Sequence, residues 1–187
     1  MSKSGATKPT IDKSNSEKPK SEKPKFVYVV YIASTAEKVW QALTDPKMTE
    51  QYWFGYQISS DWKVGSRYTA GMAGAPPFDK GTVLECDPPR RLSYTWHPQY
   101  EAFLHERHSR VTFELVQLDS QVQLTVTHDE FDEGSKVFES ISGGWPRVLS
   151  SLKSLLETGR GLPRSWSDAD KKWQTCSSET CTAEARA

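Results

Sequence analysis

The side chain best placed to do chemistry in this sequence is His128. It ends a strand-like run with Val122, Leu124 and Val126 and shares the inward parity of these residues. An imidazole that faces a pocket could hydrogen-bond a ligand or act as a general base. The alternative is a histidine satisfied by a backbone carbonyl at the strand end. No nucleophile with a base beside it, no glycine-rich phosphate loop and no paired carboxylates stand out, so no catalytic residue is predicted.

Other polar candidates are weaker. His105 and His108 are three residues apart, which places them on opposite faces of the expected strand, so no metal pair is predicted there. Cys176 and Cys181 lie in a polar tail without the further ligands that zinc requires. Arg107 has inward parity and would suit a carboxylate or phosphate, but charged groups seldom bury unpaired, which favours a solvated rim. No metal and no cofactor are predicted.

Aromatic residues give the stronger signal. The chain has seven Trp, seven Tyr and seven Phe, more than a small core filled mainly by Leu and Val needs. Most of them should be simple packing, and we expect a subset to line an apolar cavity. The predicted ligand-binding set consists of these rings and the histidine: Trp53, Tyr68, Tyr94, Trp96, Phe113, His128, Phe138 and Trp145.

Short strands and helices must position these side chains. A β-branched and aromatic run predicts a first strand over Phe26 to Ile32, and a capping box at Ser34–Glu37 opens a helix through Leu43. A second short helix starts at Asp45-Pro46 and ends near Trp53. Alternating apolar residues then predict about six antiparallel strands, near 54–60, 66–72, 81–85, 90–97, 111–115 and 122–126.

One long helix closes the folded part of the chain. Apolar residues at 145, 148, 149, 152, 155 and 156 share one stripe. Glu133-Gly134 leads into the closing helical region, which is predicted to break at Gly143-Gly144. Pro146 belongs in a first turn and Gly159 reads as a stop, so the long helix is predicted to open at Trp145-Pro146. The stripe must lie across the apolar face of the sheet. This order predicts an α+β helix-grip fold, a curved antiparallel sheet of about six or seven strands gripping the long C-terminal helix.

Composition divides the chain into three parts. Residues 1–25 repeat Ser-Glu-Lys-Pro-Lys, carry seven Lys against three acidic residues, and bury too little to fold, which predicts a disordered basic arm. Residues 26–159 form the domain, and 160–187 read as a polar, flexible tail. The domain has 12 basic and 17 acidic residues, a mildly acidic balance that argues against nucleic-acid binding. No apolar run is long enough for a membrane span, which favours a cytoplasmic protein.

A family resemblance follows from three motifs. Residues 33–46, ASTAEKVWQALTDP, resemble the opening signature of the START-like superfamily. Thr127-His128, Gly143-Gly144-Trp145-Pro146 and the run 152–159, LKSLLETG, are similar to the branch named for the activator of heat-shock-protein-90 ATPase, in its C-terminal-domain form. The resemblance covers residues 26–159 and implies the helix-grip fold. Eukaryotic namesakes have a separate N-terminal domain essential to activation, whereas only 25 low-complexity residues precede the first strand here.

The leading functional hypothesis is non-catalytic binding of a small hydrophobic molecule between the sheet and the closing helix. A co-chaperone-like interaction module acting on a chaperone ATPase is the second hypothesis. The third is a cyclase- or hydrolase-like enzyme working on an aromatic or polyketide-like substrate. The expected assembly is a monomer or a weak dimer.

Overall fold

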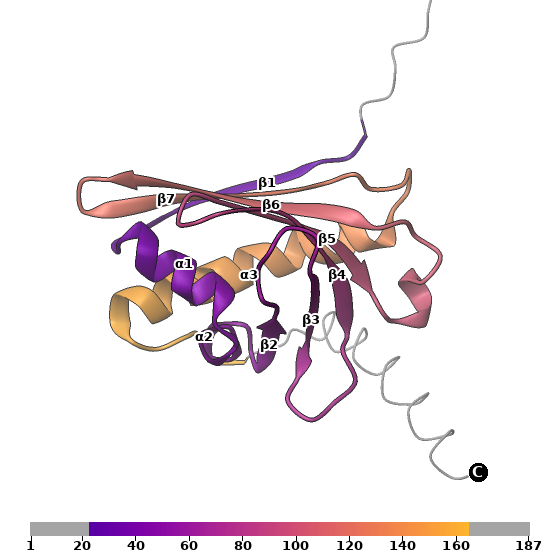
Figure 1. Ribbon diagram of the computed structural model, residues 1–187, viewed down its shortest axis with the longest axis horizontal. Coiled ribbons are helices and arrows are strands. Elements are labelled where there is room, and N and C mark those ends of the chain that lie inside the picture. Colours follow the sequence, from indigo (N-terminus) through magenta and orange to yellow (C-terminus); the bar gives the residue numbers. More distant parts are fainter. Residues whose placement is uncertain (1–22, 165–187) are drawn as a thin grey trace, which may run out of the picture.

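A computed structural model describes residues 23–164 of the 187-residue chain (Figure 1). The strands are β1 (Phe26–Ile32), β2 (Tyr56–Ser59), β3 (Arg67–Met72), β4 (Asp79–Asp87), β5 (Arg91–Pro98), β6 (Ser109–Leu118) and β7 (Gln121–Asp129). The helices are α1 (Ala36–Thr44), α2 (Pro46–Tyr52) and α3 (Lys136–Thr158), with a 3-10 turn at Glu101–Phe103. The predicted arm and tail, with Cys176 and Cys181, lie almost wholly outside the described residues.

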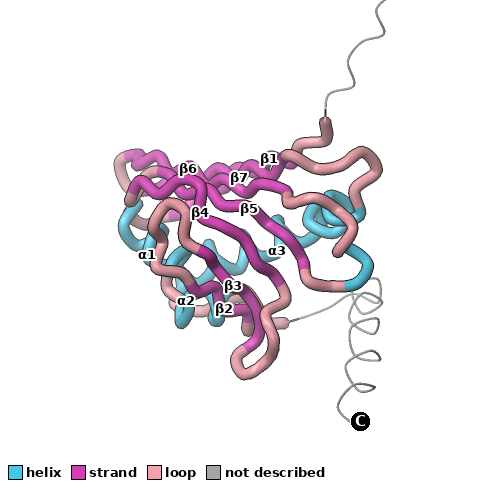
Figure 2. Tube along the Cα trace, turned by 45° about the vertical axis from the view of Figure 1, so that its right-hand side comes forward, coloured by secondary structure: helices cyan, strands magenta, loops and turns pink. Residues whose placement is uncertain are grey.

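All seven strands belong to one antiparallel sheet in the order β1-β7-β6-β5-β4-β3-β2. The strands β1, β7 and β6 run across the top of the molecule in Figure 1, and β4, β3 and β2 turn downward from them. The helix α3 lies in the concave space below (Figures 1 and 2). This arrangement is the helix-grip fold that the sequence predicts, with two short helices after the first strand.

The short helices α1 and α2 are held by residues at their junction. Thr35 is the N-cap of α1, one residue later than the predicted capping box places it, and its Oγ1 accepts from the Lys38 N–H at 3.4 Å. Asp45 ends α1 and caps α2, accepting from the Lys47 N–H at 2.8 Å. Pro46 takes the first position of α2, where its missing N–H is no loss. The two helices therefore meet at a fixed corner.

The predicted start of the long helix is wrong. The helix α3 begins at Lys136, nine residues before Trp145, and runs without interruption through Gly143-Gly144 to Gly159, whose φ of 78° is the left-handed stop. Ser135 caps its first turn, and the Glu106 carboxylate accepts from the N–H groups of Lys136 and Val137. These acceptors satisfy backbone donors that a helix start otherwise leaves unpaired, so the helix starts there and contains Pro146.

The apolar stripe of α3 faces the sheet as predicted. Trp145, Val148, Leu149, Leu152 and Leu155 are all buried, and they join the inward residues of the strands in one main core. A second, smaller core lies under the first turns of the helix and contains Phe103, Phe131 and Val137. In the part of the chain that is described, no helix is long and apolar enough to cross a membrane.

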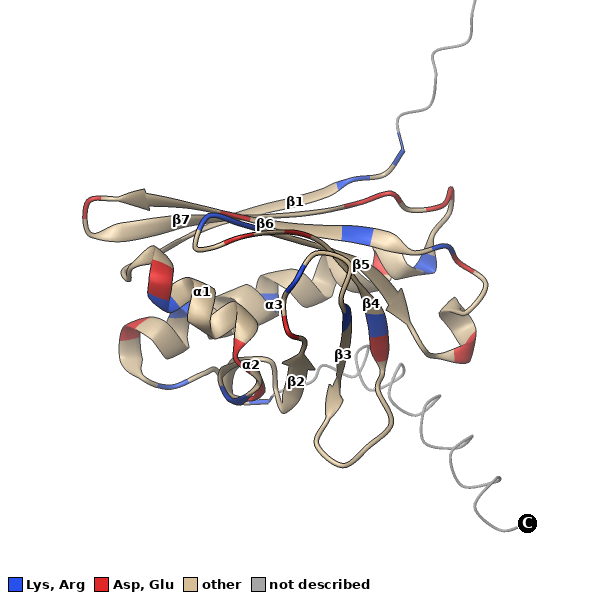
Figure 3. Ribbon diagram, in the orientation of Figure 1, with Lys and Arg blue, Asp and Glu red and all other residues tan. Residues whose placement is uncertain are grey.

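The outer face of the sheet is charged in its middle and apolar at one edge. Arg91 pairs with Glu85 and Glu114, and Arg110 pairs with Asp129, so these charges bridge four neighbouring strands. The strand β1 carries no charged residue between 26 and 32 (Figure 3). Its outward side chains, Val27, Val29 and Tyr31, are between 43% and 51% exposed. We call these three residues the β1 stripe.

Candidate functional site

Three tryptophans from three different elements meet between the sheet and α3. Trp53 follows the last turn of α2, Trp96 lies on β5, and Trp145 lies in the middle of α3. The ring centroids of Trp53 and Trp145 are 5.3 Å apart, those of Trp96 and Trp145 are 5.9 Å apart, and those of Trp53 and Trp96 are 6.0 Å apart. Each ring therefore contacts the other two at distances typical of packed aromatic pairs.

Further rings extend this group along the inner face of the sheet. Phe113 of β6 packs edge-on against Trp145 at 5.7 Å and lies 5.9 Å from Tyr94 of β5. Tyr68 of β3 approaches Tyr94 to 4.7 Å. The antiparallel register explains the meeting, because alternate residues of neighbouring strands face the same side. We call these six rings the aromatic cluster: Trp53, Tyr68, Tyr94, Trp96, Phe113 and Trp145.

His128 lies at the inner end of the aromatic cluster and is fully buried. The Trp145 indole N–H donates to Nδ1 at 3.1 Å, so Nε2 carries the proton and donates to Ser109 Oγ at 2.8 Å. Ser109 donates onward to the Trp96 carbonyl at 3.3 Å. Burial lowers the pKa of His128 to about 3, which keeps the ring neutral. Both ring nitrogens are engaged, an arrangement that orients Trp145.

Phe138 lies apart from the aromatic cluster. It packs beside the small second core, with its ring 5.2 Å from Phe131, and Phe131 in turn lies 4.6 Å from His128. The structure thus brings seven members of the predicted set into one continuous group and connects Phe138 to that group only through Phe131. The early start of α3 is the reason, because Phe138 lies on its first turns and these pack on the second core.

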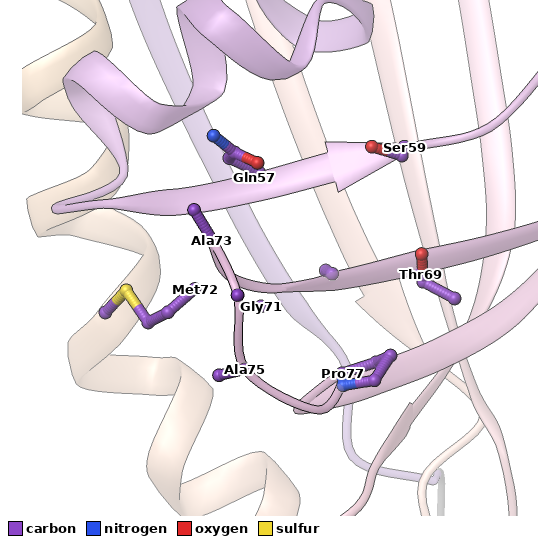
Figure 4. Close-up of a pocket in the computed structure, with 10 residues that line it drawn as sticks. Gln57, Ser59, Thr69, Gly71, Met72, Ala73, Ala75 and Pro77 are labelled. Atoms are coloured by element: carbon purple, nitrogen blue, oxygen red, sulfur yellow. The ribbon is translucent and has the colours of Figure 1, made fainter.

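Two hollows on the described surface lie away from the aromatic cluster. One, of about 140 Å³, lies at the β2–β3 hairpin, and its lining includes Gln57, Ser59, Thr69, Gly71 and Met72 (Figure 4). The other, of about 240 Å³, is lined by Lys23, Pro24, Arg107, Phe131, Asp132 and Glu133. Neither hollow is lined by a member of the aromatic cluster.

Trp53 is the least buried ring of the aromatic cluster. It is half-buried, whereas the other five members of the aromatic cluster are at most 7% exposed. The chain directly after it takes an uncommon conformation, with φ at +54° for Phe54 and +96° for Gly55. A left-handed conformation costs a non-glycine residue about 1–2 kcal/mol.

Sequence reasoning missed the polar residues beside the aromatic cluster. Asp79, the first residue of β4, is 3% exposed and accepts a hydrogen bond from the Tyr56 hydroxyl at 3.1 Å. Burial raises the pKa of Asp79 to about 7, although hydrogen bonds from Tyr56 and Trp96 oppose the shift. The signal was its parity with Gly81 and Val83, which places all three on the inner face. The predicted strand began only at residue 81 and so left Asp79 in a loop.

The remaining polar candidates lie at the surface. Arg107 pairs with Asp132 and donates to the carbonyls of Glu130 and Phe131, with its side chain 45% exposed, which is the solvated rim that the sequence favours. His108 stacks on His97, with ring centroids 4.5 Å apart. Within residues 23–164, no group of three or more His, Cys, Asp or Glu side chains is arranged to hold a metal ion.

Comparison with known proteins identifies a family. The model of the family described as Activator of Hsp90 ATPase homolog 1-like protein matches residues 33–157. No curated protein matches the chain. A crystal structure of a protein from Mesorhizobium loti has 27% sequence identity and a TM-score of 0.61, covering 71% of this chain and 96% of its own.

Two further structures are similar in fold. The solution structure of the Aha1 dimer from Colwellia psychrerythraea has 23% identity and a TM-score of 0.61, covering 74% of this chain and 99% of its own. The crystal structure of an HSP90 activator from Plasmodium falciparum has 20% identity and a TM-score of 0.59, covering 71% of this chain and 95% of its own. At these identities the likeness shows the fold alone.

Proposed function

The chain belongs to the family of Activator of Hsp90 ATPase homolog 1-like proteins, and within that family we propose that it binds a small hydrophobic ligand without catalysing a reaction. The observation that carries this proposal is the aromatic cluster, in which six rings from the end of α2 and from β3, β5, β6 and α3 converge, and one of them, Trp53, is only partly buried. Converging apolar rings with a few polar groups are typical of small-molecule sites.

Entry requires Trp53 to leave its place against Trp96 and Trp145. An apolar ligand would then take over the ring faces that Trp53 covers, so the apolar surface stays out of water. His128 holds Trp145 through its Nδ1 and Trp96 through Ser109, which fixes two walls of the site. We assign His128 this positioning role, and no proton transfer is part of the proposal.

The test removes the displaceable ring. Ligand-observed NMR should show that naphthalene binds saturably to the wild-type protein. The variant Trp53→Ala should bind naphthalene at least ~10-fold more tightly, because no ring has to move. Trp53→Leu, which keeps an apolar side chain, should lie between the two. Tyr31→Ala, which removes an exposed ring on the outer face, is the control and should bind as the wild type does. Absence of saturable binding in all four proteins would end the ligand-binding proposal.

A second candidate function rests on the β1 stripe. The described stripe is uncharged and half-exposed on an edge strand, and such a face is typical of a contact with another protein. Given the family description, the partner we propose is Hsp90. Val29→Lys should then abolish any stimulation of the ATPase rate of purified Hsp90. Val64→Lys, the same change at a residue 67% exposed in the β2–β3 turn, should leave the stimulation intact.

A further inference from the structure

Polar groups gather at one side of the aromatic cluster. The Asp79 carboxyl is buried there and accepts from Tyr56 through one oxygen. A carboxyl group offers more hydrogen-bonding positions than these two contacts occupy, so the hydrogen bonds from Tyr56 and Trp96 leave part of its capacity unused. The location is fixed by the sheet, since Asp79 lies opposite Ala70 on β3 and Pro98 on β5.

Two buried tyrosine hydroxyls near Tyr94 lack partners. Tyr52 and Tyr68 are each 1% exposed, and neither hydroxyl has a hydrogen-bond partner among the residues that the structure describes. Burial raises the pKa of Tyr68 and of Tyr94, and the nearby Asp79 charge raises both further. Tyr52 also raises the pKa of Tyr94. Buried polar groups in proteins are almost always paired, so two orphans in one small region need an explanation.

Packing holds the Tyr68 hydroxyl in this position. The Tyr68 ring lies directly over Gly81, where a Cβ atom would approach its Cε1 to 2.5 Å and the Thr95 carbonyl oxygen to 1.9 Å. The ring of Tyr68 therefore packs against the backbone of Gly81, and its centroid lies 4.7 Å from that of Tyr94. Rotation that would bring the hydroxyl to water is blocked by these neighbours.

We propose that Asp79 and the hydroxyl of Tyr68 form a polar subsite that binds the hydroxyl group of an aromatic ligand. This inference rests on the proposed ligand-binding function and names its ligand class, a phenol or a hydroxylated polycyclic aromatic. A ligand hydroxyl both donates and accepts, so it can donate to Asp79 and accept from a tyrosine. A ligand carboxylate has no proton to donate to Asp79, and an ammonium group cannot accept from Tyr68. The surrounding rings select an aromatic frame over an aliphatic one.

The test compares naphthalene with 2-naphthol, which differ by one hydroxyl. In the full-length protein, calorimetric titration should show 2-naphthol binding about tenfold more tightly, the effect of one net hydrogen bond worth about 1.4 kcal/mol. Tyr68→Phe should reduce this preference severalfold and leave naphthalene binding unchanged. Asp79→Asn should also reduce it. Tyr31→Phe, which removes a hydroxyl from the exposed outer face, should keep the full preference.

The outcomes separate the two proposals. Equal affinity of both probes for the wild-type protein would overturn the subsite while the ligand-binding function stands. An undiminished preference in Tyr68→Phe and Asp79→Asn would also overturn it, because the hydroxyl would then be recognised elsewhere. Failure of both probes to bind would overturn the proposed function together with the subsite. Tyr68→Phe removes an unpaired hydroxyl, so it keeps the fold and the test does not depend on Asp79→Asn alone.

Discussion

Asp79→Asn should change how the stability of this protein depends on pH, because it removes one of two buried groups whose pKa values shift in opposite directions on folding. The pKa of Asp79 rises from 3.8 to about 7 on folding, so the folded protein keeps a proton that the unfolded chain has lost. Its contribution to the free energy of unfolding therefore falls as the pH rises from about 4 to about 7. The pKa of His128 drops from 6.5 to about 3, so its contribution falls as the pH drops below about 6.5.

Between about pH 4 and pH 6.5 the pH dependences of these two contributions cancel. The folded protein holds one proton on Asp79 and the unfolded chain holds one on His128, so unfolding does not change the number of bound protons on these two groups. The substitution Asp79→Asn keeps an oxygen that can accept from Tyr56 but removes the titration. A difference of about three pKa units at about 1.4 kcal/mol each predicts that the variant gains about 4 kcal/mol relative to the wild type between pH 4 and pH 7.

Urea unfolding followed by tryptophan fluorescence at half-unit steps of pH would measure this difference. Subtracting the two profiles removes every group that both proteins share, so only Asp79 remains. Asp61→Asn is the matched control, because hydrogen bonds from Ser66 and the Lys63 N–H lower the pKa of this exposed carboxyl. Its difference profile should be flat above about pH 4. Parallel profiles for wild type and Asp79→Asn would refute the assignment of a buried, protonated carboxyl.

Three further substitutions probe the packing around the site, each measured by urea unfolding. Gly81→Ala should destabilise the protein by roughly 3 kcal/mol or more, since its Cβ would lie 1.9 Å from the Thr95 carbonyl oxygen. Its control, Gly143→Ala, has open space around the new Cβ and should gain up to about 1 kcal/mol of stability from helix propensity. Leu152→Ala should cost about 2–5 kcal/mol because the side chain is fully buried, whereas Ser150→Ala on the exposed side should be nearly neutral. Trp145→Phe should cost about 1–3 kcal/mol by leaving Nδ1 of His128 without its donor; equal stability would show that this hydrogen bond is dispensable.

The strands could be predicted because alternation is a local property. Leu92, Tyr94 and Trp96 face inward on β5 as their spacing indicates, and β1 has the bounds read from its β-branched run. The same parity places Ser109 of β6 and His128 of β7 on the inner face of the sheet. Their hydrogen bond could not be predicted, because it depends on the register between two strands and parity alone does not give this register.

The continuity of α3 through Gly143-Gly144 and Pro146 could not be predicted from local sequence. Gly143-Gly144 and Pro146 all disfavour a helix interior, and residue 146 has no N–H to donate to the carbonyl four residues earlier. The helix persists because tertiary contacts outweigh these costs. Glu106, thirty residues away in the chain, accepts from its first N–H groups, and Val137 and Ile141 pack on the second core. Such long-range support is invisible to a search for caps and breakers.

Asp79 shows a different limit of sequence reasoning. A charged residue after Pro76-Pro77 is typical of a solvated turn, and only the three-dimensional register of β3, β4 and β5 carries it into the interior. Its partner Tyr56 comes from β2, at the far edge of the same sheet from β1. Burial of a carboxyl is therefore a property of the assembled sheet, and the sequence signal for it was a single matched parity.

The position of Trp53 sets how tightly any ligand can bind. A ligand gains access only in the fraction of molecules in which the ring has swung out, and its apparent affinity is reduced by that fraction. If the closed arrangement is favoured by about 2 kcal/mol, roughly 3% of the molecules are open, and Trp53→Ala should bind about 30-fold more tightly than wild type. Equal affinity of Trp53→Ala and the wild-type protein for naphthalene would show that no closing of this ring limits binding.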